Sequence, residues 1–423
     1  MGYDFYADNK ERDYLRELAK KYLHYSNLPI MEQRKKLWYR HNSLKGERPV
    51  IVVEHKTFQD DIIPPLKCKN TAAREIEWNL LFAIINHELI DDDKVISPYY
   101  TVYWKIDTVQ SSLEVKRVYA KDSTGRLLGY TEQHTISDLK RDLSLMKPSV
   151  FSADREYTLA WKSFVEEVIG DILPVKIKNN SLYWYLSPSQ KVVRLMGLEN
   201  MMISIVDYPE EMHALYRFLV EDIMAFVKWQ EREGILEFNN ENDYAGAGSY
   251  GFSNELPSKN YSEVGTVTPK DLWGNLNSQE TIGISPAMFG EFIFPYYYEI
   301  ARCFGLLYYG CCEPVHYIWK DYISKLPGLR KVSVSPWCDE EYMGSVLKDS
   351  NSIIYSRKPS PNFIGVGSTF DEEMFSAHIV KTLKAAKGCH LEFIFRDVYT
   401  ISGDIHKPGR AVKIVRELIE KQW

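Results

Sequence analysis

The stretch ISPAMFGEFIFPYYYEIARCFGLLYYGCCEP, residues 284–314, joins an amphipathic helix to a buried strand. Ser285 followed by Pro286 is typical of a helix N-terminus, because serine caps the first turn and proline suits its first position. After Gly305 an unbroken apolar run stops at Cys311, Cys312 and Glu313. A run that is apolar on both faces is typical of a parallel strand covered on both sides. The stretch therefore predicts a helix, then an interior strand that ends in thiols and a carboxylate.

The same pattern, a short apolar run that ends in polar residues, recurs along the chain and alternates with helical segments. Strands that alternate with helices favour a parallel sheet with helical crossovers. We therefore expect an α/β protein, a (β/α)8 TIM barrel, whose strand ends form one common mouth. The runs are RPVIVVEH (48–55), GILEFNNEND (234–243), GLLYYGCCEP (305–314), LRKVSVSPWCD (329–339), SNSIIYSRKP (350–359) and CHLEFIFRDVYT (389–400).

Two further regions complete the expected organisation. Residues 1–45 carry helical spacing and form an N-terminal helical extension, which leaves residues 46–423 as a single barrel domain. Within that domain, residues 88–175 contain alternating stretches such as YYTVYWKI and SSLEVKRVYA, which predict an antiparallel insertion.

Composition excludes several classes of function. The net charge is only −6 and the basic residues are dispersed, so we expect no nucleic-acid binding. No apolar run reaches the roughly 18 residues of a membrane span, so we expect no membrane insertion. Six cysteines without a secretory leader fit a reducing compartment. These features predict a soluble cytoplasmic protein with a small-molecule partner.

Several separated segments resemble one family. SQETIGISPAMFGEFIFPYYYEIARCFGLLYYGCCEP (278–314), DYPEEMHALYRFLVEDI (207–223) and LRKVSVSPWCD (329–339) are similar, in the same order, to the uroporphyrinogen decarboxylase superfamily. The resemblance covers about residues 45–423 and implies a (β/α)8 barrel. That superfamily includes uroporphyrinogen decarboxylases and cobalamin-dependent methyltransferases, which move a methyl group between a corrinoid protein and a thiol. The resemblance also implies that two copies of the chain pair as a homodimer.

The sequence departs from both branches of this superfamily. The decarboxylases carry an arginine-rich loop after the first strand, whereas EHKTFQDDIIPP (54–65) holds no arginine. The methyltransferases bind zinc through a His-x-Cys pair and a later cysteine, and these positions correspond to Tyr309, Cys311 and the Arg396–Asp397 pair. Only Cys311 carries over, so a zinc site here needs other ligands, and Glu313 and Cys338 are the candidates.

The strand ends supply the remaining candidate site residues. As catalytic groups we expect Cys311 as metal ligand or reactive thiol, Asp243 and Glu392 for proton transfer, and Tyr309 beside them. Arg357, Lys358 and Arg396 are suited to orienting an anion, and Glu392 and Arg396 share one strand face as a predicted pair. The other substrate-binding candidates are Glu54, His55, Asn240, Asn242 and Trp337.

Three functions remain open at this point. The first is a methyltransferase-like enzyme that works with a corrinoid protein on a small substrate, with zinc as a second expected cofactor. The second is decarboxylation of a carboxylated tetrapyrrole or other ring. The third is a protein that binds a tetrapyrrole or corrinoid without chemistry. Fold alone does not choose among them.

Overall fold

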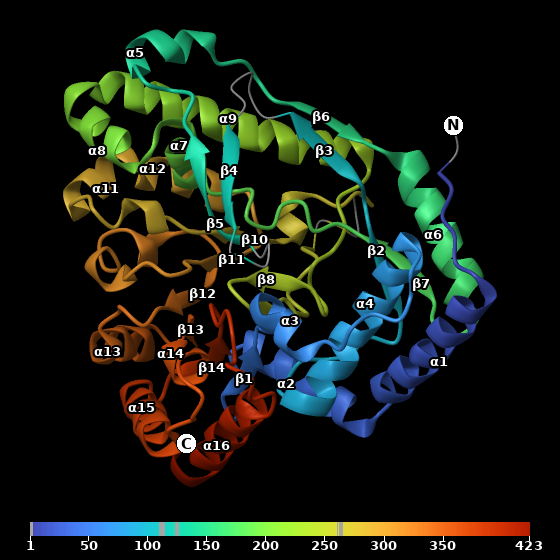
Figure 1. The fold of residues 1–423 in the computed structure, drawn as a ribbon. Helices are drawn as coiled ribbons and strands as arrows, with labels where there is room; N and C mark the ends of the chain where they lie inside the picture. Colours follow the sequence, from blue (N-terminus) through green and yellow to red (C-terminus); the bar gives the residue numbers. More distant parts are fainter. Residues whose placement is uncertain (1–2, 110–114, 122, 124–126, 260, 262–264) are drawn as a thin grey trace.

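The computed structural model describes residues 3–109, 115–121, 123, 127–259, 261 and 265–423. Its centre is a sheet of six strands, in which each strand runs parallel to its neighbours. Figure 1 shows these strands as an arc around a short hairpin that carries the label β8. In spatial order the strands are β1 (Val50–Val53), β14 (His390–Phe395), β13 (Ile354–Arg357), β12 (Leu329–Val334), β11 (Leu306–Tyr309) and β10 (Trp273–Leu276).

Residues alternate between the two faces of this sheet. We call the face toward the hairpin the inner side and the opposite face the outer side. Apolar side chains such as Val53, Val332 and Phe393 belong to the main core, together with helices that cover the outer side. The inner side is more polar, since it presents Lys331, Glu392 and other hydrogen-bonding groups. The predicted alternation of helices and strands is therefore confirmed for the C-terminal part of the chain, from β10 to α16 (Lys407–Gln422).

A second apolar cluster lies beside the six-stranded sheet. There β2 (Tyr100–Tyr103) pairs in parallel with β7 (Val175–Lys178). One face of this pair packs on α1 (Asn9–Ser26), α4 (Thr71–Ile85) and α6 (Arg155–Ile169). The predicted N-terminal helices are thus confirmed as α1 and α2 (Pro29–Asn42), and α2 packs against β1 through Trp38.

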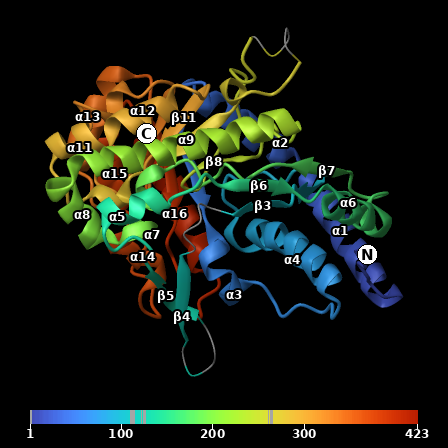
Figure 2. The same ribbon diagram turned by 90° about the horizontal axis from the view of Figure 1, so that it is seen from above.

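The insertion contains the predicted antiparallel pairs. β3 (Ile106–Val109) pairs with β6 (Val150–Ala153), and β4 (Lys116–Lys121) pairs with β5 (Leu127–Gln133). Figure 2 shows β4 and β5 projecting from the body of the molecule on the side of α3 and α14. The two ends of this region, β2 and β7, form the parallel pair described above, so the insertion is mixed rather than wholly antiparallel.

The other helices connect or cover these strands. The short hairpin in the centre consists of β8 (Tyr244–Gly246) and β9 (Ser249–Tyr250). None of the helices among the described residues is both long and apolar enough to cross a bilayer. The remaining helices are α3 (Gln59–Ile62), α5 (Leu139–Asp142), α7 (Pro188–Met196), α8 (Leu198–Asp207), α9 (Pro209–Glu233), α11 (Pro286–Phe292), α12 (Phe294–Ala301), α13 (Glu340–Ser350), α14 (Asn362–Gly365), α15 (Glu372–Ala385) and α16 (Lys407–Gln422).

The local order of elements differs from the sequence-based expectation at three places. Residues 234–243 form turns and extended backbone rather than a strand, while β10, which the sequence patterns did not predict, lies at the sheet edge. The segment after Pro314, where the alternation of strands and helices would place a helix, holds only the short 3-10 turns Val315–Tyr317 and Ile323–Lys325. The six hydrogen-bonded strands do not form a closed ring in the described residues, so closure into an eight-stranded barrel stays a prediction.

A charged network is buried between α2, the hairpin and the inner side of the sheet. Lys331 Nζ lies 3.0 Å from Glu392 Oε2 and both side chains are fully buried. The same carboxylate oxygen is 3.1 Å from His41 Nε2 and accepts a hydrogen bond from the Ser249 hydroxyl. Burial lowers the pKa of Lys331, while the Lys331 ammonium and His41 hold the pKa of Glu392 well below its usual range. Glu392 therefore pairs with Lys331, and the predicted Glu392–Arg396 pair is wrong.

Lys331→Met tests this network, because it leaves the Glu392 carboxylate buried without its main counter-charge. We expect the variant to lose about 3–5 kcal/mol of unfolding free energy, measured by urea denaturation. The double variant Lys331→Met, Glu392→Leu removes both charges and should lose clearly less. Equal losses in the single and double variants would contradict an ion pair at this position.

Candidate functional site

The hairpin β8–β9 fits against the sheet because two of its residues have no side chain. A methyl group on Gly246 would lie 2.5 Å from the Tyr308 ring and 2.8 Å from Asn275 Oδ1. Gly248 has φ +92° and faces Ile394 so closely that a methyl group would overlap it. Ser249 then hydrogen-bonds Lys331 and Glu392. Glycines and one anchoring serine thus place the hairpin deep on the inner side of the sheet.

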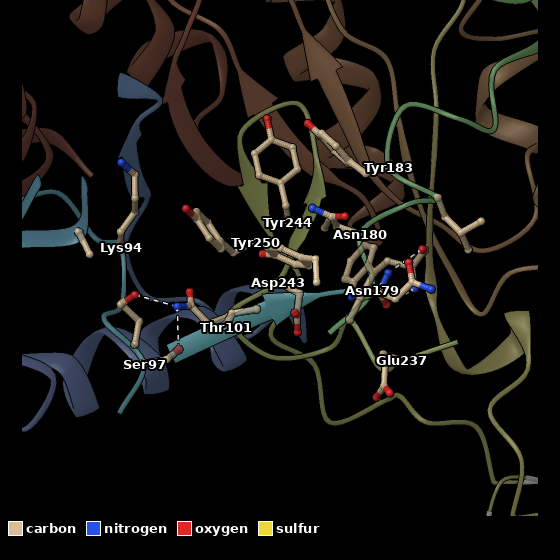
Figure 3. Close-up of a pocket in the computed structure, with 18 of the residues that line it drawn as sticks. Lys94, Ser97, Thr101, Asn179, Asn180, Tyr183, Glu237, Asp243, Tyr244 and Tyr250 are labelled. Atoms are coloured by element: carbon tan, nitrogen blue, oxygen red, sulfur yellow. Dashed lines mark hydrogen bonds between the residues drawn. The ribbon is translucent and has the colours of Figure 1, made fainter. Parts of the chain in front are cut away.

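A cavity of about 460 Å³ lies between this hairpin, the β2–β7 pair and the residues that follow β1. Figure 3 shows Tyr244 and Tyr250 of the hairpin, with Asp243 just before it, among the lining side chains. A volume of this order suits a small organic molecule. The described lining is aromatic and amide-rich, and it includes Tyr22, Phe82, Tyr99, Tyr103, Tyr183, Tyr244, Tyr250, Trp273, Asn86, Asn179, Asn180, Asn239, Asn242 and Asn275.

Asp243 is the acidic group of the lining that the sequence predicted. Its Oδ2 accepts a 3.0 Å bond from Lys178 Nζ at the end of β7. The pKa of Asp243 is raised by burial, and Lys178 opposes that rise. No hydrogen bond to the other oxygen, Oδ1, is found among the described residues. The Asp243 carboxyl is thus held in place through one oxygen and has the second available to a ligand.

His55 and Lys94 line the cavity at the end of β1. Lys94 Nζ donates to Val53 O, Asn86 Oδ1 and His55 Nδ1 at 2.5–2.9 Å. Burial and the Lys94 charge hold the pKa of His55 well below its usual range, so the imidazole is neutral at physiological pH. Its Nε2 lies 3.1 Å from Phe82 O. All three ammonium hydrogens of Lys94 are used, which makes this pair a rigid wall of the cavity.

Asn242 and Asn240 have different positions although they are close in sequence. Asn242 lines the cavity, and its Nδ2 donates to Val95 O and Ser97 Oγ. Asn240 Nδ2 donates to Ser253 O and Leu256 O, and this residue is not part of the lining. Of the predicted site residues, His55, Asn242 and Asp243 come together at the cavity.

Glu54 and Arg396 lie outside the cavity lining, next to the lining residue Tyr244. The Tyr244 hydroxyl donates to Glu54 Oε1 at 2.5 Å, and Arg396 Nε is 3.4 Å from Glu54 Oε2 and 3.3 Å from Asp397 Oδ2. Tyr183 lines the cavity and lies within electrostatic reach of both Glu54 and Arg396. Arg396 Nη1 and the Tyr183 hydroxyl are buried without a hydrogen-bond partner in the described structure. This second polar cluster therefore borders the cavity without lining it.

Cys311 and Cys312 belong to the same second cluster. Their sulfur atoms are 3.5 Å apart, and Cys312 Sγ is 3.5 Å from Asp397 Oδ2. Gly310, at φ +97°, interrupts the regular strand alternation just before Cys311. Cys311 is 5% exposed, and its contact with Cys312 and its burial raise the pKa of its thiol. A protonated, enclosed thiol is a poor nucleophile.

The predicted metal ligands do not fit a zinc ion. Glu313 accepts the backbone N–H groups of Ser278 and Cys311 at 2.8 Å, so both of its oxygens are occupied. Cys338 Sγ is bonded to Ser335 Oγ and to the Glu313 carbonyl oxygen on the outer side. Among the residues that the structure describes, no three His, Cys, Asp or Glu side chains are close enough to hold a metal.

The remaining predicted residues lie away from the cavity. The Tyr309 hydroxyl bonds Ser278 in the outer core, and Arg357 donates to Val334, Ser335 and Glu340 beneath α13. Trp337 is 71% exposed. Lys358 is on the inner side, where it donates to Tyr308 and Ser356, and burial lowers its pKa to about 7.

Sequence reasoning missed Lys178 and most of the cavity's aromatic wall. Lys178 ends β7 at the close of the insertion, where no apolar run marked a strand. The missed Asn275 lies in β10, whose run WGNL is broken by polar and small residues. The signal that could have found them was the density of tyrosine around residues 99–103 and 244–250.

The comparisons with known proteins leave the family unassigned. Neither a family model nor a curated protein matches this chain. Among solved structures the chain is similar to a methyltransferase from Methanosarcina mazei, with 12% identity and a TM-score of 0.49 over 92% of this chain and 98% of that one. A likeness at that level supports no conclusion about function.

Gly248→Ala tests the placement of the hairpin. The new methyl group would overlap Ile394 in a backbone conformation that L-residues rarely adopt, so we expect a loss of about 2–4 kcal/mol in unfolding free energy. Gly234→Ala is the matched control, because Gly234 also has positive φ but no atom within 4 Å, and it should lose only about 1 kcal/mol. Equal losses would show that the hairpin does not pack as described.

The burial of Cys311 is open to a chemical test. We expect iodoacetamide to alkylate Cys311 in the native protein at neutral pH more than about tenfold more slowly than in urea, because the enclosed thiol stays protonated. The half-buried Cys312 serves as the internal comparison and should react faster. Peptide mass spectrometry measures both, and rapid alkylation of native Cys311 would restore its predicted role as a nucleophile.

Proposed function

We propose that this protein is an enzyme that acts on a small polar molecule in the cavity beside β8–β9, and that its reaction is methyl transfer. The observation that carries the proposal is the Asp243 carboxyl, fixed by Lys178 through one oxygen and facing an aromatic, amide-lined cavity of about 460 Å³. A perturbed acid in such a cavity is the usual arrangement for proton transfer to a bound substrate.

The charge of the lining favours a small substrate over a carboxylated tetrapyrrole. Lys94 is the one lysine or arginine among the described lining residues, and its three hydrogens are bound to protein acceptors. A substrate with many carboxylates would find no free cation there, and burying unpaired carboxylates is costly. The chemistry of the cavity thus argues against the decarboxylase alternative.

The residues of this chain would bind, orient and enclose the substrate. Tyr103, Tyr183 and Tyr244 supply apolar contact area, and Asn179 and Asn180 supply amide groups. Asp243 would balance the charge or move the proton that changes at the substrate heteroatom when its bond to the methyl group breaks or forms. His55 is neutral and held between Phe82 and Lys94, so its part is to shape the wall.

The reaction class comes from the resemblance to the uroporphyrinogen decarboxylase superfamily. That resemblance implies a corrinoid, carried by a partner protein, as the second participant in methyl transfer. The thiols of Cys311 and Cys312 are not part of the cavity lining, so we assign the substrate to the cavity and no step to the thiols.

A direct assay tests the proposal. The protein is mixed with reduced cobalamin and with small N-, O- or S-methyl compounds, and formation of methylcobalamin is followed by absorbance. We expect transfer from at least one such compound. Release of carbon dioxide from a carboxylated ring without methyl transfer would instead support the decarboxylase alternative, and binding without turnover would support a binding protein.

Asp243→Asn tests the role of the carboxyl. The amide keeps the shape but removes both the charge and the proton, so we expect kcat/KM to fall about 10²–10⁴-fold with little change in melting temperature. Glu199→Gln on the exposed side of α8 makes the same chemical change away from the cavity and should leave the rate unchanged. Full activity of Asp243→Asn would remove Asp243 from the mechanism.

A further inference from the structure

We propose that the cavity binds a small methylated ammonium compound with a hydroxyl group, of which choline is the simplest example. The inference rests on the proposed function only in taking this cavity as the substrate site. It concerns recognition, and it follows from the charge balance at Asp243, the aromatic lining and one buried amide without partners.

The charge balance near Asp243 is negative. Lys178 is the cation in contact with Asp243, and Glu237 and Glu241 lie within electrostatic reach of the same pair. Three carboxyl groups therefore share one ammonium group. Burial raises the pKa values of Asp243 and Glu237, and the neighbouring carboxyl groups raise them further. A bound cation would supply the missing positive charge.

The aromatic lining favours an organic cation. Burial raises the pKa values of Tyr99 and Tyr103, and the nearby Asp243 charge raises them further. Tyr244 follows Asp243 directly in sequence and also lines the cavity. Aromatic rings attract ammonium groups through the negative charge of their faces, and methylated ammonium ions are commonly bound this way. A metal ion is disfavoured, since no suitable group of three ligand side chains exists among the described residues.

Asn275 is the second, independent observation that indicates a ligand. It is 4% exposed, it lines the cavity, and neither its Oδ1 nor its Nδ2 has a hydrogen-bond partner in the described structure. A buried amide with both groups unsatisfied is costly, and native proteins rarely keep one without a reason. A ligand that both donates and accepts a hydrogen bond would satisfy it.

A hydroxyl meets this requirement better than a carboxylate. One hydroxyl can donate to Asn275 Oδ1 and accept from Nδ2, whereas a carboxylate only accepts. A carboxylate would also need a cation, and Lys94 already donates its three hydrogens to Val53, His55 and Asn86. The site should therefore prefer choline to glycine betaine.

Isothermal titration calorimetry with the full chain tests the inference. The probes are choline, its neutral isostere 3,3-dimethylbutan-1-ol, tetramethylammonium and glycine betaine. We expect choline to bind at least about tenfold more tightly than the neutral isostere, because only choline gains the cation–π and carboxylate attraction. It should also bind more tightly than glycine betaine. Equal binding of choline and the isostere, or no choline binding, would overturn the inference.

Asn275→Leu separates the hydroxyl contact from the charge contact. The variant should weaken choline binding about 5–10-fold, which is the size of one ordinary hydrogen bond, and leave tetramethylammonium binding unchanged. Because leucine removes the two unsatisfied polar groups of Asn275, the melting temperature of the variant should stay the same or rise. A lower melting temperature, or an equal effect on both ligands, would assign Asn275 a structural role and contradict the inference.

Glu237→Gln separates charge from shape, with Glu199→Gln as the matched control. Glu237→Gln should weaken the binding of choline and of tetramethylammonium equally, and the control should weaken the binding of neither.

Choline binding without methyl transfer would leave this inference standing while the proposed reaction fails. Turnover of a neutral methyl compound by a protein that does not bind choline would overturn this inference and leave the proposed reaction standing.

Discussion

The close packing of the β8–β9 hairpin against the inner side of the sheet determines where this protein can bind a ligand. Gly246 and Gly248 let the backbone approach Tyr308 and Ile394, and Ser249 anchors the hairpin to the Lys331–Glu392 pair. The hairpin covers part of the inner side of the six-stranded sheet, and the cavity is the volume left between the hairpin and the β2–β7 pair.

Two groups of buried polar side chains on the inner side differ in how well they are satisfied. Lys331 donates hydrogen bonds to Glu392 Oε2 and to Ser249, and His41 also contacts Glu392 Oε2. The other oxygen, Glu392 Oε1, has no hydrogen-bond partner in the described structure. Toward the strand ends, Arg396, Tyr183 and Asn275 keep several donors and acceptors without partners in the described structure. A partnered buried charge stabilises a fold, whereas a concentration of unpartnered groups is more typical of a binding site.

The sequence predicted strands well where apolar runs were unbroken and poorly where they were not. β1, β11, β12, β13 and β14 coincide with such runs, while Gly274 and Asn275 interrupt β10. The position of a residue at a strand end was a less reliable guide to the site. The side of the sheet on which its side chain lies depends on the strand register and on the residue at which the in–out alternation of side chains stops. Arg357 and Tyr309 are near strand ends yet face the outer core, and Gly310 redirects the two cysteines. Asp243, His55 and Asn242 reach the cavity because the loops that carry them turn inward.

Tyr244 gives the two polar clusters a physical connection. Its ring lines the cavity and its hydroxyl bonds Glu54, whose other oxygen faces Arg396 near Asp397 and Cys312. A ligand that shifts this ring must lengthen or turn the Glu54 contact, since the hydroxyl and the ring move as one rigid group. Arg396 Nε lies between the carboxylates of Glu54 and Asp397, and Asp397 in turn contacts Cys312, so one continuous set of polar contacts joins the cavity lining to the thiol pair.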